Sequence, residues 1–185
     1  MVIYMAEKKK IALLGAGTMG VGIAQMFAQA GHEVKLIYVY DDKVRARPYE
    51  TMTANLNILR DEGVLDGEEI PAILGRVSCT ESLEEGAAFA DVIIECIVEN
   101  LAIKQDYFQK LDKLCPPSTI LTTNTSAISV TEIAEKAVHK ERIIGTHFWN
   151  PAYLIPLVEV IRTEYVSDEV VQAVYDLMQE AGKKP

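Results

Sequence analysis

The sequence predicts an α/β protein with a Rossmann-like, doubly wound and mainly parallel sheet. Three observations lead to this prediction. Short apolar runs alternate along the chain with amphipathic segments of helical length, as in successive βαβ units. The segment 10–42 reads as strand, glycine-rich turn, helix and strand. A hydrophobic content of 49% over 185 residues is enough for one core of ordinary size.

The first unit contains the motif G-x-G-x-x-G at Gly15, Gly17 and Gly20, between a predicted strand at 11–14 and a predicted helix at 18–30. The apolar face of this helix is expected at Val21, Ala24, Phe27 and Ala28. In this setting the motif predicts dinucleotide binding. Gly15 allows the tight turn, Gly17 lets a pyrophosphate approach the backbone, and Gly20 lets the helix pack on the strand. The N–H groups at the helix N-terminus would face the phosphates.

The other elements follow from the same periodicities and from proline, glycine and capping signals. Further strands are expected at 34–39, 76–79, 91–96, 118–122, 142–147 and 157–161. Further helices are expected at 100–114, from Ser129 to about Lys136, and at 167–182. The helix at 100–114 is expected to bury Ile103, Tyr107, Leu111 and Leu114. Between them, 81–90 reads as a polar, alanine-rich connection.

Residues 43–75 interrupt the alternation and predict a helical hairpin inserted after the second strand. Its first helix is expected to begin near Pro48 and to end at Gly63, and Asp66 to cap a short second helix that ends at Gly75. Two interpretations stay open: helices that cover an edge of the sheet, or an arm that grips substrate. We assign 1–8 to an N-terminal extension and 9–185 to one dinucleotide-binding domain.

Composition narrows the classes of partner. The net charge of −9 would repel a phosphate backbone, so we expect no nucleic-acid partner. No apolar run approaches the roughly 20 residues of a membrane span, and the first residues lack a secretory signal. The three cysteines have no metal-ligand spacing and fit buried thiols in a reducing compartment, so we expect a cytoplasmic protein without a metal site.

The carboxyl ends of the predicted strands carry polar residues, where open α/β sheets bind ligands. The segments that meet there are 15–20, 96–100, 124–126 and 147–150. His147 suits a general base, and Glu159, twelve residues later, could hold its second nitrogen. From chemistry alone, a structural role for this histidine is an equal alternative.

Four stretches resemble the N-terminal domain of the 3-hydroxyacyl-CoA dehydrogenases, over nearly the whole chain. They are GAGTMGVGIAQMFAQAGHEV, ADVIIECIVENLAIK, CPPSTILTTNTSAISVTEIA and RIIGTHFWNPAYLIPLVEVI. The resemblance implies an NAD-dependent enzyme of fatty acid metabolism that interconverts 3-hydroxyacyl-CoA and 3-ketoacyl-CoA. It makes His147 the catalytic base, Glu159 its partner and Ser126 a contact to the reacting oxygen.

The resemblance also implies a set of cofactor contacts. Glu99 and Lys104 would lie near the ribose and nicotinamide, and Asn150 by the nicotinamide. The full set is Gly15, Gly17, Thr18, Met19, Gly20, Asp41, Glu99, Lys104, Asn124 and Asn150.

The chain departs from the family pattern at the end of the second strand, where Tyr38 stands in place of an acidic residue. Asp41 or Asp42 would then bond the ribose hydroxyls and favour NAD. NADP is not excluded, because Lys43 or Arg45 could meet a 2′-phosphate.

Two further departures concern activity. The stretch HFWNPAYLIPLVEV is closer to the gulonate dehydrogenase and lambda-crystallin branch, so a non-thioester 3-hydroxy acid is an alternative substrate. The family's helical C-terminal domain, which forms the homodimer and closes the substrate cleft, has no counterpart in these 185 residues. We therefore expect little activity from them alone. A non-catalytic dinucleotide-binding module is the other alternative, although Ser126, His147 and Glu159 together favour an enzyme.

Overall fold

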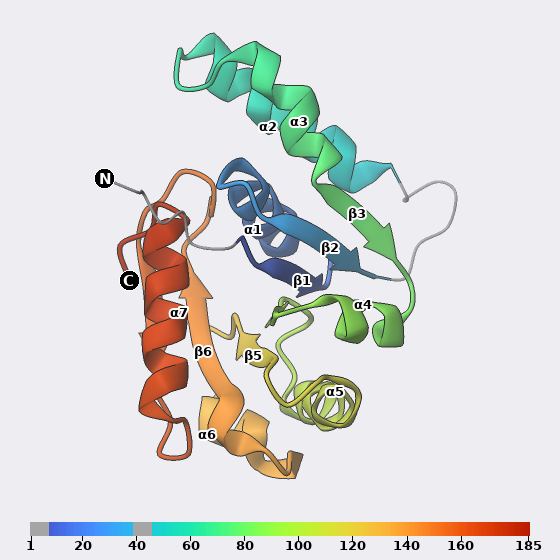
Figure 1. The fold of residues 1–185 in the computed structure, drawn as a ribbon, viewed down its shortest axis with the longest axis vertical. Coiled ribbons are helices and arrows are strands. Elements are labelled where there is room, and N and C mark those ends of the chain that lie inside the picture. Colours follow the sequence, from blue (N-terminus) through green and yellow to red (C-terminus); the bar gives the residue numbers. More distant parts are fainter. Residues whose placement is uncertain (1–7, 39–45) are drawn as a thin grey trace.

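A single seven-stranded sheet forms the centre of the molecule (Figure 1). The computed structural model describes residues 8–38 and 46–185. The sheet order is β3-β2-β1-β4-β5-β6-β7, and only β7 runs antiparallel to its neighbour among these strands. The strands are β1 (Lys10–Leu14), β2 (Glu33–Ile37), β3 (Val77–Thr80), β4 (Val92–Glu95), β5 (Ile120–Thr123), β6 (Ile143–Phe148) and β7 (Val158–Ile161). The predicted mainly parallel sheet is confirmed.

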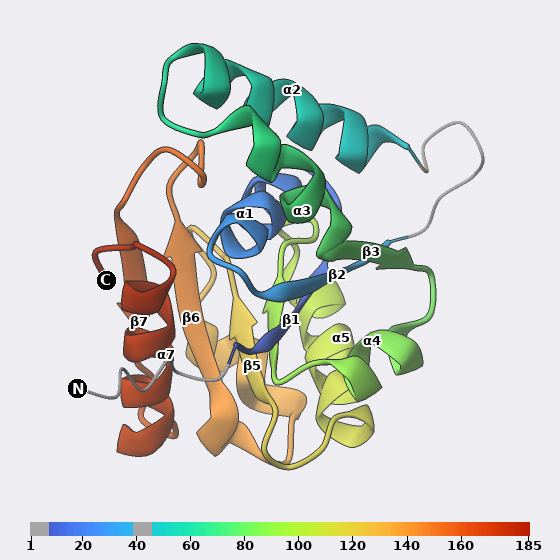
Figure 2. The same cartoon turned by 45° about the horizontal axis from the view of Figure 1, so that its top comes forward.

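Helices cover both faces of the sheet, as the doubly wound prediction requires (Figures 1 and 2). One face carries α1 (Thr18–Gln29), α2 (Arg47–Asp61), α3 (Ile70–Gly75) and α7 (Asp168–Glu180). The other carries α4 (Leu83–Phe89), α5 (Leu101–Leu114) and α6 (Val130–Ile133). Short 3-10 turns occur at Gly67–Glu69, Ala134–Lys136 and Lys140–Arg142.

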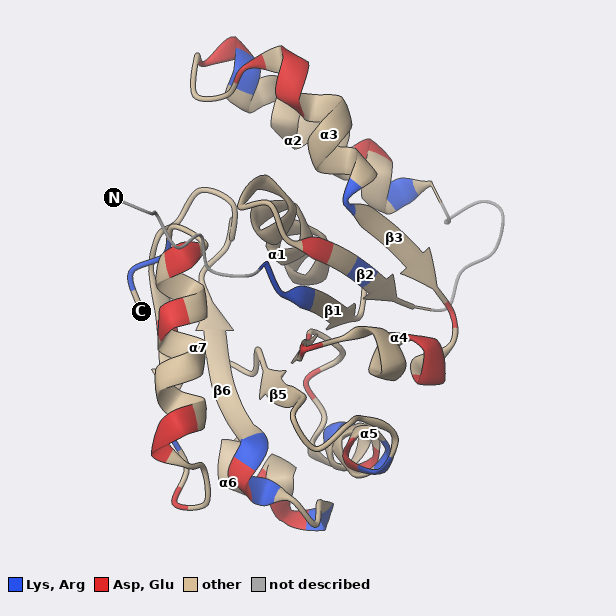
Figure 3. Ribbon diagram, viewed as in Figure 1, with Lys and Arg blue, Asp and Glu red and all other residues tan. Residues whose placement is uncertain are grey.

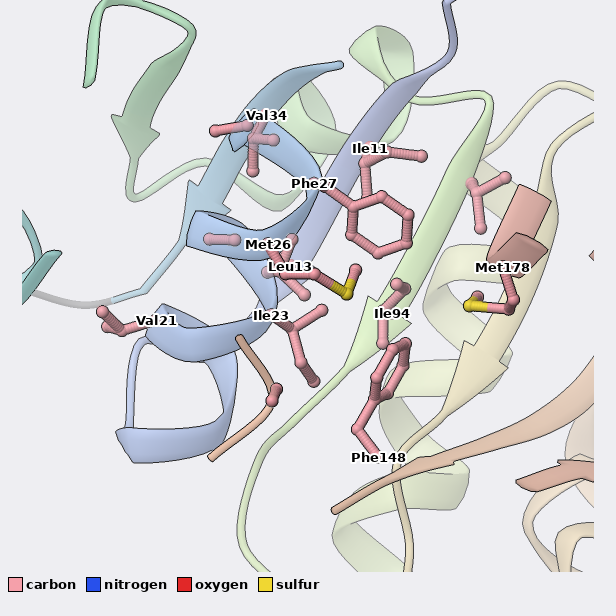
Figure 4. Packing of buried hydrophobic residues seen from close by; sticks show 14 of the residues in the cluster. Ile11, Leu13, Val21, Ile23, Met26, Phe27, Val34, Ile94, Phe148 and Met178 are labelled. Carbon is pink, nitrogen blue, oxygen red and sulfur yellow. The ribbon is translucent and has the colours of Figure 1, made fainter. Parts of the chain in front are cut away.

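Alternate residues of β1 divide between two hydrophobic cores, because successive strand side chains point to opposite faces. Ile11 and Leu13 join the core under α1, whereas Ala12 and Leu14 join the core under α5. Figure 4 shows the first core, where Phe27 of α1 meets Phe148 of β6 edge to face with ring centroids 6.4 Å apart. This contact ties the first βα unit to the strand that carries His147.

Helix α1 is buried more completely than its sequence predicted. The expected face residues are buried, but so is every residue from Gly20 to Ala28, including the polar Gln25. The reason is the inserted hairpin of α2 and α3, which covers the side of α1 turned away from the sheet. Asn55 of α2 donates to Gln25 at 3.0 Å and accepts from the Tyr153 hydroxyl at 3.1 Å.

The hairpin has the predicted form: α2 has Pro48 in its first turn, and Asp66 caps the following turn by accepting from the Glu68 N–H at 3.0 Å. It lies on α1 rather than along a strand edge alone. A substrate-gripping role for it stays a prediction, and residues 43–45 of the predicted insert lie outside the described part of the chain.

Two sequence predictions are wrong on the face of the sheet that carries α4 and α5. The segment 81–90 is not a mere connection, because Leu83–Phe89 forms α4. Its start has the form S-x-x-E, and the Ser82 hydroxyl accepts from the Glu85 N–H at 3.0 Å. This cap stabilises the first turn, so the segment forms a helix despite its polar composition.

The buried side of α5 was also predicted wrongly. Leu111 is buried as expected, but Ile103 and Leu114 are 40% and 39% exposed. Lys104 and Asp112 occupy the inner side with Phe108 instead. Both charged residues are held there by ion pairs, which a hydrophobic pattern does not register.

Charged residues on the outer elements are spread rather than gathered in one field. Figure 3 shows acidic residues at several levels of α7. Lys8, in the predicted N-terminal extension, pairs with Glu180 of α7 at 2.5 Å. Across residues 8–38 and 46–185, no helix is both long and apolar enough to cross a membrane.

Candidate active site

The glycine-rich turn has the geometry that each glycine was predicted to provide. Gly15 adopts φ +110°, and a Cβ there would lie 2.7 Å from the Cys96 carbonyl oxygen. A Cβ on Gly20 would lie 2.0 Å from the Gly15 carbonyl oxygen, so α1 could not approach β1 as closely. Gly17 differs from both, because a Cβ there would meet nothing within 4 Å. The backbone at Gly17 is therefore open to a ligand.

The N-terminus of α1 opens onto a cleft of about 420 Å³. Gly17 is the N-cap of this helix, and no side chain in the described part of the chain caps it. The first N–H groups of α1 therefore point to the rim of the sheet, where an anion is favoured by the helix dipole. The cleft is lined by Ala16, Gly17, Thr18, Val21, Gly22, Arg47, Pro48, Thr51, Asn55 and Asn150–Tyr153.

His147 and Glu159 face each other because β6 and β7 pair in one register. In this antiparallel pair the two residues are direct partners. The His147 Nδ1 atom lies 2.6 Å from the Glu159 Oε2 atom. The hydrogen bond from His147 holds the pKa of the Glu159 carboxyl below its usual range. A carboxylate on Nδ1 fixes the ring and leaves Nε2 facing the opposite way.

Ser126 stands on that opposite side of the imidazole. Its Oγ atom lies 3.1 Å from the His147 Nε2 atom. Both residues line a second pocket of about 260 Å³. This pocket is lined by Met19, Asn124, Ser126, His147, Phe148, Trp149 and Asn150. Three of the four predicted strand-end segments, 15–20, 124–126 and 147–150, thus meet at this pocket.

Asn124 and Asn150 connect this pocket with its surroundings. The Asn124 Oδ1 atom accepts from the Phe148 N–H at 2.8 Å, which ties the end of β5 to the end of β6. Asn150 lines both the second pocket and the cleft beside Gly17. Met19 also reaches the second pocket from the first turn of α1. The two hollows are therefore neighbours along one rim.

Glu99 lies beside Ser126 and holds the loop that carries it. Its Oε1 atom accepts from the Thr125 hydroxyl, from the Ser126 N–H at 3.1 Å and from the Ala127 N–H at 3.3 Å. Burial raises the pKa of this carboxyl, but the hydrogen bonds from Thr125 and Lys104 outweigh that effect, and the pKa is lowered. Glu99 is therefore ionised at neutral pH.

Lys104 is placed differently from the other predicted contacts. Its side chain is 1% exposed, and its Nζ atom lies 2.7 Å from Glu95 Oε1 and 3.2 Å from Glu99 Oε2. It reaches the rim through Glu99. A direct contact between Lys104 and a cofactor stays a prediction.

Glu95 was not among the predicted site residues, and Thr125 was predicted only as part of the rim segment 124–126. Glu95 is fully buried at the end of β4, in the run DVIIEC. A carboxylate in an otherwise apolar strand needs a buried partner, and this was a usable signal. Lys104, nine residues later, is that partner.

Asp41 lies outside the described residues, as do Asp42, Lys43 and Arg45. Tyr38 directly follows β2. Within the described ranges, no cluster of three or more histidine, cysteine, aspartate or glutamate side chains could hold a metal ion.

Fold and glycine turn together define a nucleotide-binding domain of the Rossmann class. Residues 10–185 match the family model described as 3-hydroxyacyl-CoA dehydrogenase, NAD binding domain. The chain belongs to this family, as its NAD-binding domain.

Relatives and solved structures agree with this assignment. A probable 3-hydroxybutyryl-CoA dehydrogenase of Bacillus subtilis is 41% identical over 179 residues, which are 96% of this chain and 61% of that protein. The crystal structure of 3-hydroxybutyryl-CoA dehydrogenase from Escherichia coli superposes with a TM-score of 0.91 at 38% identity, over 97% of this chain and 38% of that one. A diketoreductase structure gives a TM-score of 0.89 at 25% identity, over 98% of this chain and 64% of that one.

The chain thus spans less than two thirds of the length of these proteins. The names of two other relatives place them in different compartments: a mouse hydroxyacyl-coenzyme A dehydrogenase is mitochondrial and a cucumber multifunctional protein is glyoxysomal.

Proposed function

We propose that this domain belongs to an enzyme that interconverts a 3-hydroxyacyl-CoA and a 3-ketoacyl-CoA by hydride transfer with NAD. The observation that carries the proposal is the hydrogen-bonded row Ser126, His147 and Glu159, placed beside the open N-terminus of α1. A domain that only bound a dinucleotide would not need a base together with a carboxylate that orients it.

The residues at the rim fit NAD. Gly17 leaves open space at the N-terminus of α1, and the cleft there shares Asn150 as a lining residue with the pocket of His147. The helix N–H groups would hold the pyrophosphate. Asn150 and Met19 line the pocket where a nicotinamide would meet a substrate. NAD, when bound, supplies the acceptor for the hydride of the alcohol carbon.

His147 performs the proton transfer in this proposal. Oxidation of a secondary alcohol releases the hydroxyl proton as the hydride leaves the same carbon. The His147 Nε2 atom accepts that proton, while Glu159 on Nδ1 stabilises the imidazolium that forms. The Ser126 hydroxyl, next to Nε2, donates to the oxygen as it becomes a carbonyl. In the reverse direction His147 returns the proton to the reduced oxygen.

The test is the variant His147→Gln, with His139→Gln as its matched control. His139 bonds Asp112, a residue of the last turn of α5, so its loss removes a histidine without touching the pocket. A positioned base contributes about 10²–10⁴-fold, so turnover should fall by about that factor in His147→Gln alone. The assay follows NADH absorbance with acetoacetyl-CoA, in a chain that also carries the family's C-terminal domain. Equal turnover in both variants would remove His147 from the mechanism.

A ketone or 3-hydroxy acid without the thioester is the second candidate substrate. The likeness to the diketoreductase, at 25% identity, supports it together with the stretch HFWNPAYLIPLVEV. Comparing kcat/KM for acetoacetyl-CoA and for free acetoacetate decides between the two. A higher value for the free acid would favour this second candidate.

We also propose NAD rather than NADP, because Asp41 and Asp42 follow the second strand closely in sequence. Dissociation constants for NADH and NADPH test this directly. Tighter NADPH binding that weakens in Arg45→Ala would reverse the preference.

Location and assembly follow from the same proposal. An acyl-CoA is the expected partner, and a homodimer is expected only for a chain with the family's C-terminal domain. The cytoplasmic location stays a prediction, since relatives carry mitochondrial and glyoxysomal names.

A further inference from the structure

Glu95 is a fully buried carboxylate whose hydrogen bonds lead to two different loops of the rim. Its Oε1 atom accepts from the Ile97 N–H at 2.7 Å and from Lys104 Nζ at 2.7 Å. Its Oε2 atom accepts from the Thr123 hydroxyl at 2.6 Å. The first bond holds the loop after β4, the second reaches the first turn of α5, and the third holds the last residue of β5. Glu95 thus joins neighbouring strands where both enter the site.

Lys104 bonds both Glu95 and Glu99, although its positive charge is unfavourable where it lies. It lies in the first turn of α5, where the helix dipole disfavours a cation, and it is 1% exposed, so its charge is also desolvated. A lysine in this position needs negative charge close by. Glu95 and Glu99 supply it from two sides, at 2.7 Å and 3.2 Å from Nζ.

Glu99 bonds Lys104 on one side and the Ser126 backbone on the other. One of its oxygens faces Lys104, and the other accepts from the Thr125 hydroxyl and from the N–H groups of Ser126 and Ala127. Five residues therefore form one unit, the Glu95 network: Glu95, Glu99, Lys104, Thr123 and Thr125. It ends at the backbone of Ser126, whose hydroxyl faces His147.

We infer that Glu95 is a positioning residue for the reaction, which fixes Ser126 against His147 through Lys104 and Glu99. This inference rests on the proposed function of the Ser126–His147 pair. Glu95 itself is buried beneath the rim and touches neither pocket.

Loss of the Glu95 charge has a definite consequence for this geometry. With glutamine at position 95, Lys104 keeps a single carboxylate partner, Glu99. The ammonium then draws the Glu99 carboxylate inward and away from the N–H groups of Ser126 and Ala127. The Ser126 hydroxyl loses its fixed place beside His147.

The chain offers a matched control for this variant. Asp112 is also a buried carboxylate of an ion pair, 5% exposed, with Arg142 Nη2 2.8 Å from its Oδ1 atom. It lies eight residues after Lys104 on α5, which is about 12 Å along the helix. Asp112→Asn therefore removes a comparable buried charge at the far end of the same helix.

The experiment compares Glu95→Gln and Asp112→Asn in turnover, KM and thermal midpoint, in a chain that also carries the family's C-terminal domain. A misplaced reacting group costs up to about 100-fold, so we expect kcat to fall at least about tenfold in Glu95→Gln with KM within about threefold. Asp112→Asn should lose thermal stability but keep kcat within about twofold. Wild-type kcat in Glu95→Gln, or an equal loss of kcat in both variants, would overturn the inference.

A milder pair of variants covers the case in which either substitution prevents folding. Thr123→Val removes a buried hydroxyl that donates to Glu95 and accepts from the Thr125 N–H at 3.3 Å. Thr119→Val removes a buried hydroxyl that donates to the Ala90 carbonyl at 2.9 Å, at the opposite end of β5. We expect kcat to fall about two- to fivefold in Thr123→Val only. Equal kcat in both would contradict the inference.

Amide hydrogen exchange gives a readout that does not depend on turnover. In Glu95→Gln and in Thr123→Val the Ser126 and Ala127 amides should exchange at least about tenfold faster, and in the two controls they should not. Absence of hydride transfer in the wild type, tested in a chain that also carries the family's C-terminal domain, would contradict the proposed function. Unchanged exchange at Ser126 would contradict the role of Glu95, whatever the activity.

Discussion

Replacement of Gly17 by valine separates the two roles that glycines have in the nucleotide-binding turn. The backbone at Gly17 has φ −75° and ψ −173°, an extended conformation that valine adopts readily. A Cβ there meets nothing within 4 Å. Exchange of glycine for an apolar residue at an N-cap costs about 1 kcal/mol. Gly17→Val should therefore fold like the wild type.

Cofactor binding should respond much more strongly. A branched side chain at Gly17 would fill the open space above the first N–H groups of α1, where a pyrophosphate must approach. Hydrogen bonds to a charged group contribute about 1.5–3 kcal/mol each, so loss of two of them costs at least about 3 kcal/mol. At about 1.4 kcal/mol per factor of ten, the NADH dissociation constant should rise by about 100-fold or more.

Trp149 provides the assay, because it is the single tryptophan of the chain and lies in the pocket beside Asn150. Energy transfer from Trp149 to NADH measures the dissociation constant, and circular dichroism on the same samples measures the thermal midpoint. An unchanged dissociation constant in Gly17→Val would refute the reasoning about the open N-terminus.

Gly20→Ala is the control for the glycine turn and should behave in the opposite way. Its Cβ would lie 2.0 Å from the Gly15 carbonyl oxygen, so α1 must move away from β1. Overpacking of this kind costs about 1–3 kcal/mol or more, and we expect a clear fall in thermal midpoint. A Gly20→Ala protein as stable as the wild type would show that the turn relaxes more easily than its geometry implies.

Three further predictions concern single polar side chains. Glu159→Gln should reduce turnover by no more than His147→Gln does, because it disturbs the orientation of the base rather than removing it; a larger loss, measured in the same NADH assay, would assign Glu159 a more direct role. Lys183 donates to the Ala152 and Ile155 carbonyls, and burial lowers its pKa from 10.5 to about 8. Between pH 8 and 10.5 the lysine is therefore protonated in the unfolded chain but largely neutral in the folded one. Because the unfolded chain binds more protons in this range, the free energy of unfolding should rise with pH. At about 1.4 kcal/mol per pKa unit the wild type should gain up to about 3 kcal/mol relative to Lys183→Met between pH 8 and 10.5; parallel urea-unfolding curves across this range would contradict it. His32 is buried, its Nε2 atom has no hydrogen-bond partner within the described residues, and burial lowers its pKa below 6.5. The unfolded chain therefore takes up a proton first as pH falls through 6.5, and the wild type should lose stability relative to His32→Gln between pH 7.5 and 5 in urea unfolding; an equal loss in both would exclude His32 as the cause.

The sequence alone determined the elements whose signals are local. The strand, glycine turn and helix around Gly15, Gly17 and Gly20 follow from spacing and from the conformational freedom of glycine. The meeting of Ser126, His147 and Asn150 at one rim follows from the general rule for parallel strands. The S-x-x-E start of α4 was also local, and Ser82 could have been recognised as a cap.

Only the tertiary structure decided which polar residues are partners. Glu159 meets the Nδ1 atom of His147 because β6 and β7 pair antiparallel in one register, and a shift of one residue would turn Glu159 to the other face. Lys104 and Glu95 are buried together because each compensates the desolvated charge of the other, which reverses what the hydropathy of α5 and β4 predicts. Whether a charged side chain is buried depends on the partner that lies next to it in the folded protein. The separation of two residues along the sequence does not show that they are such partners.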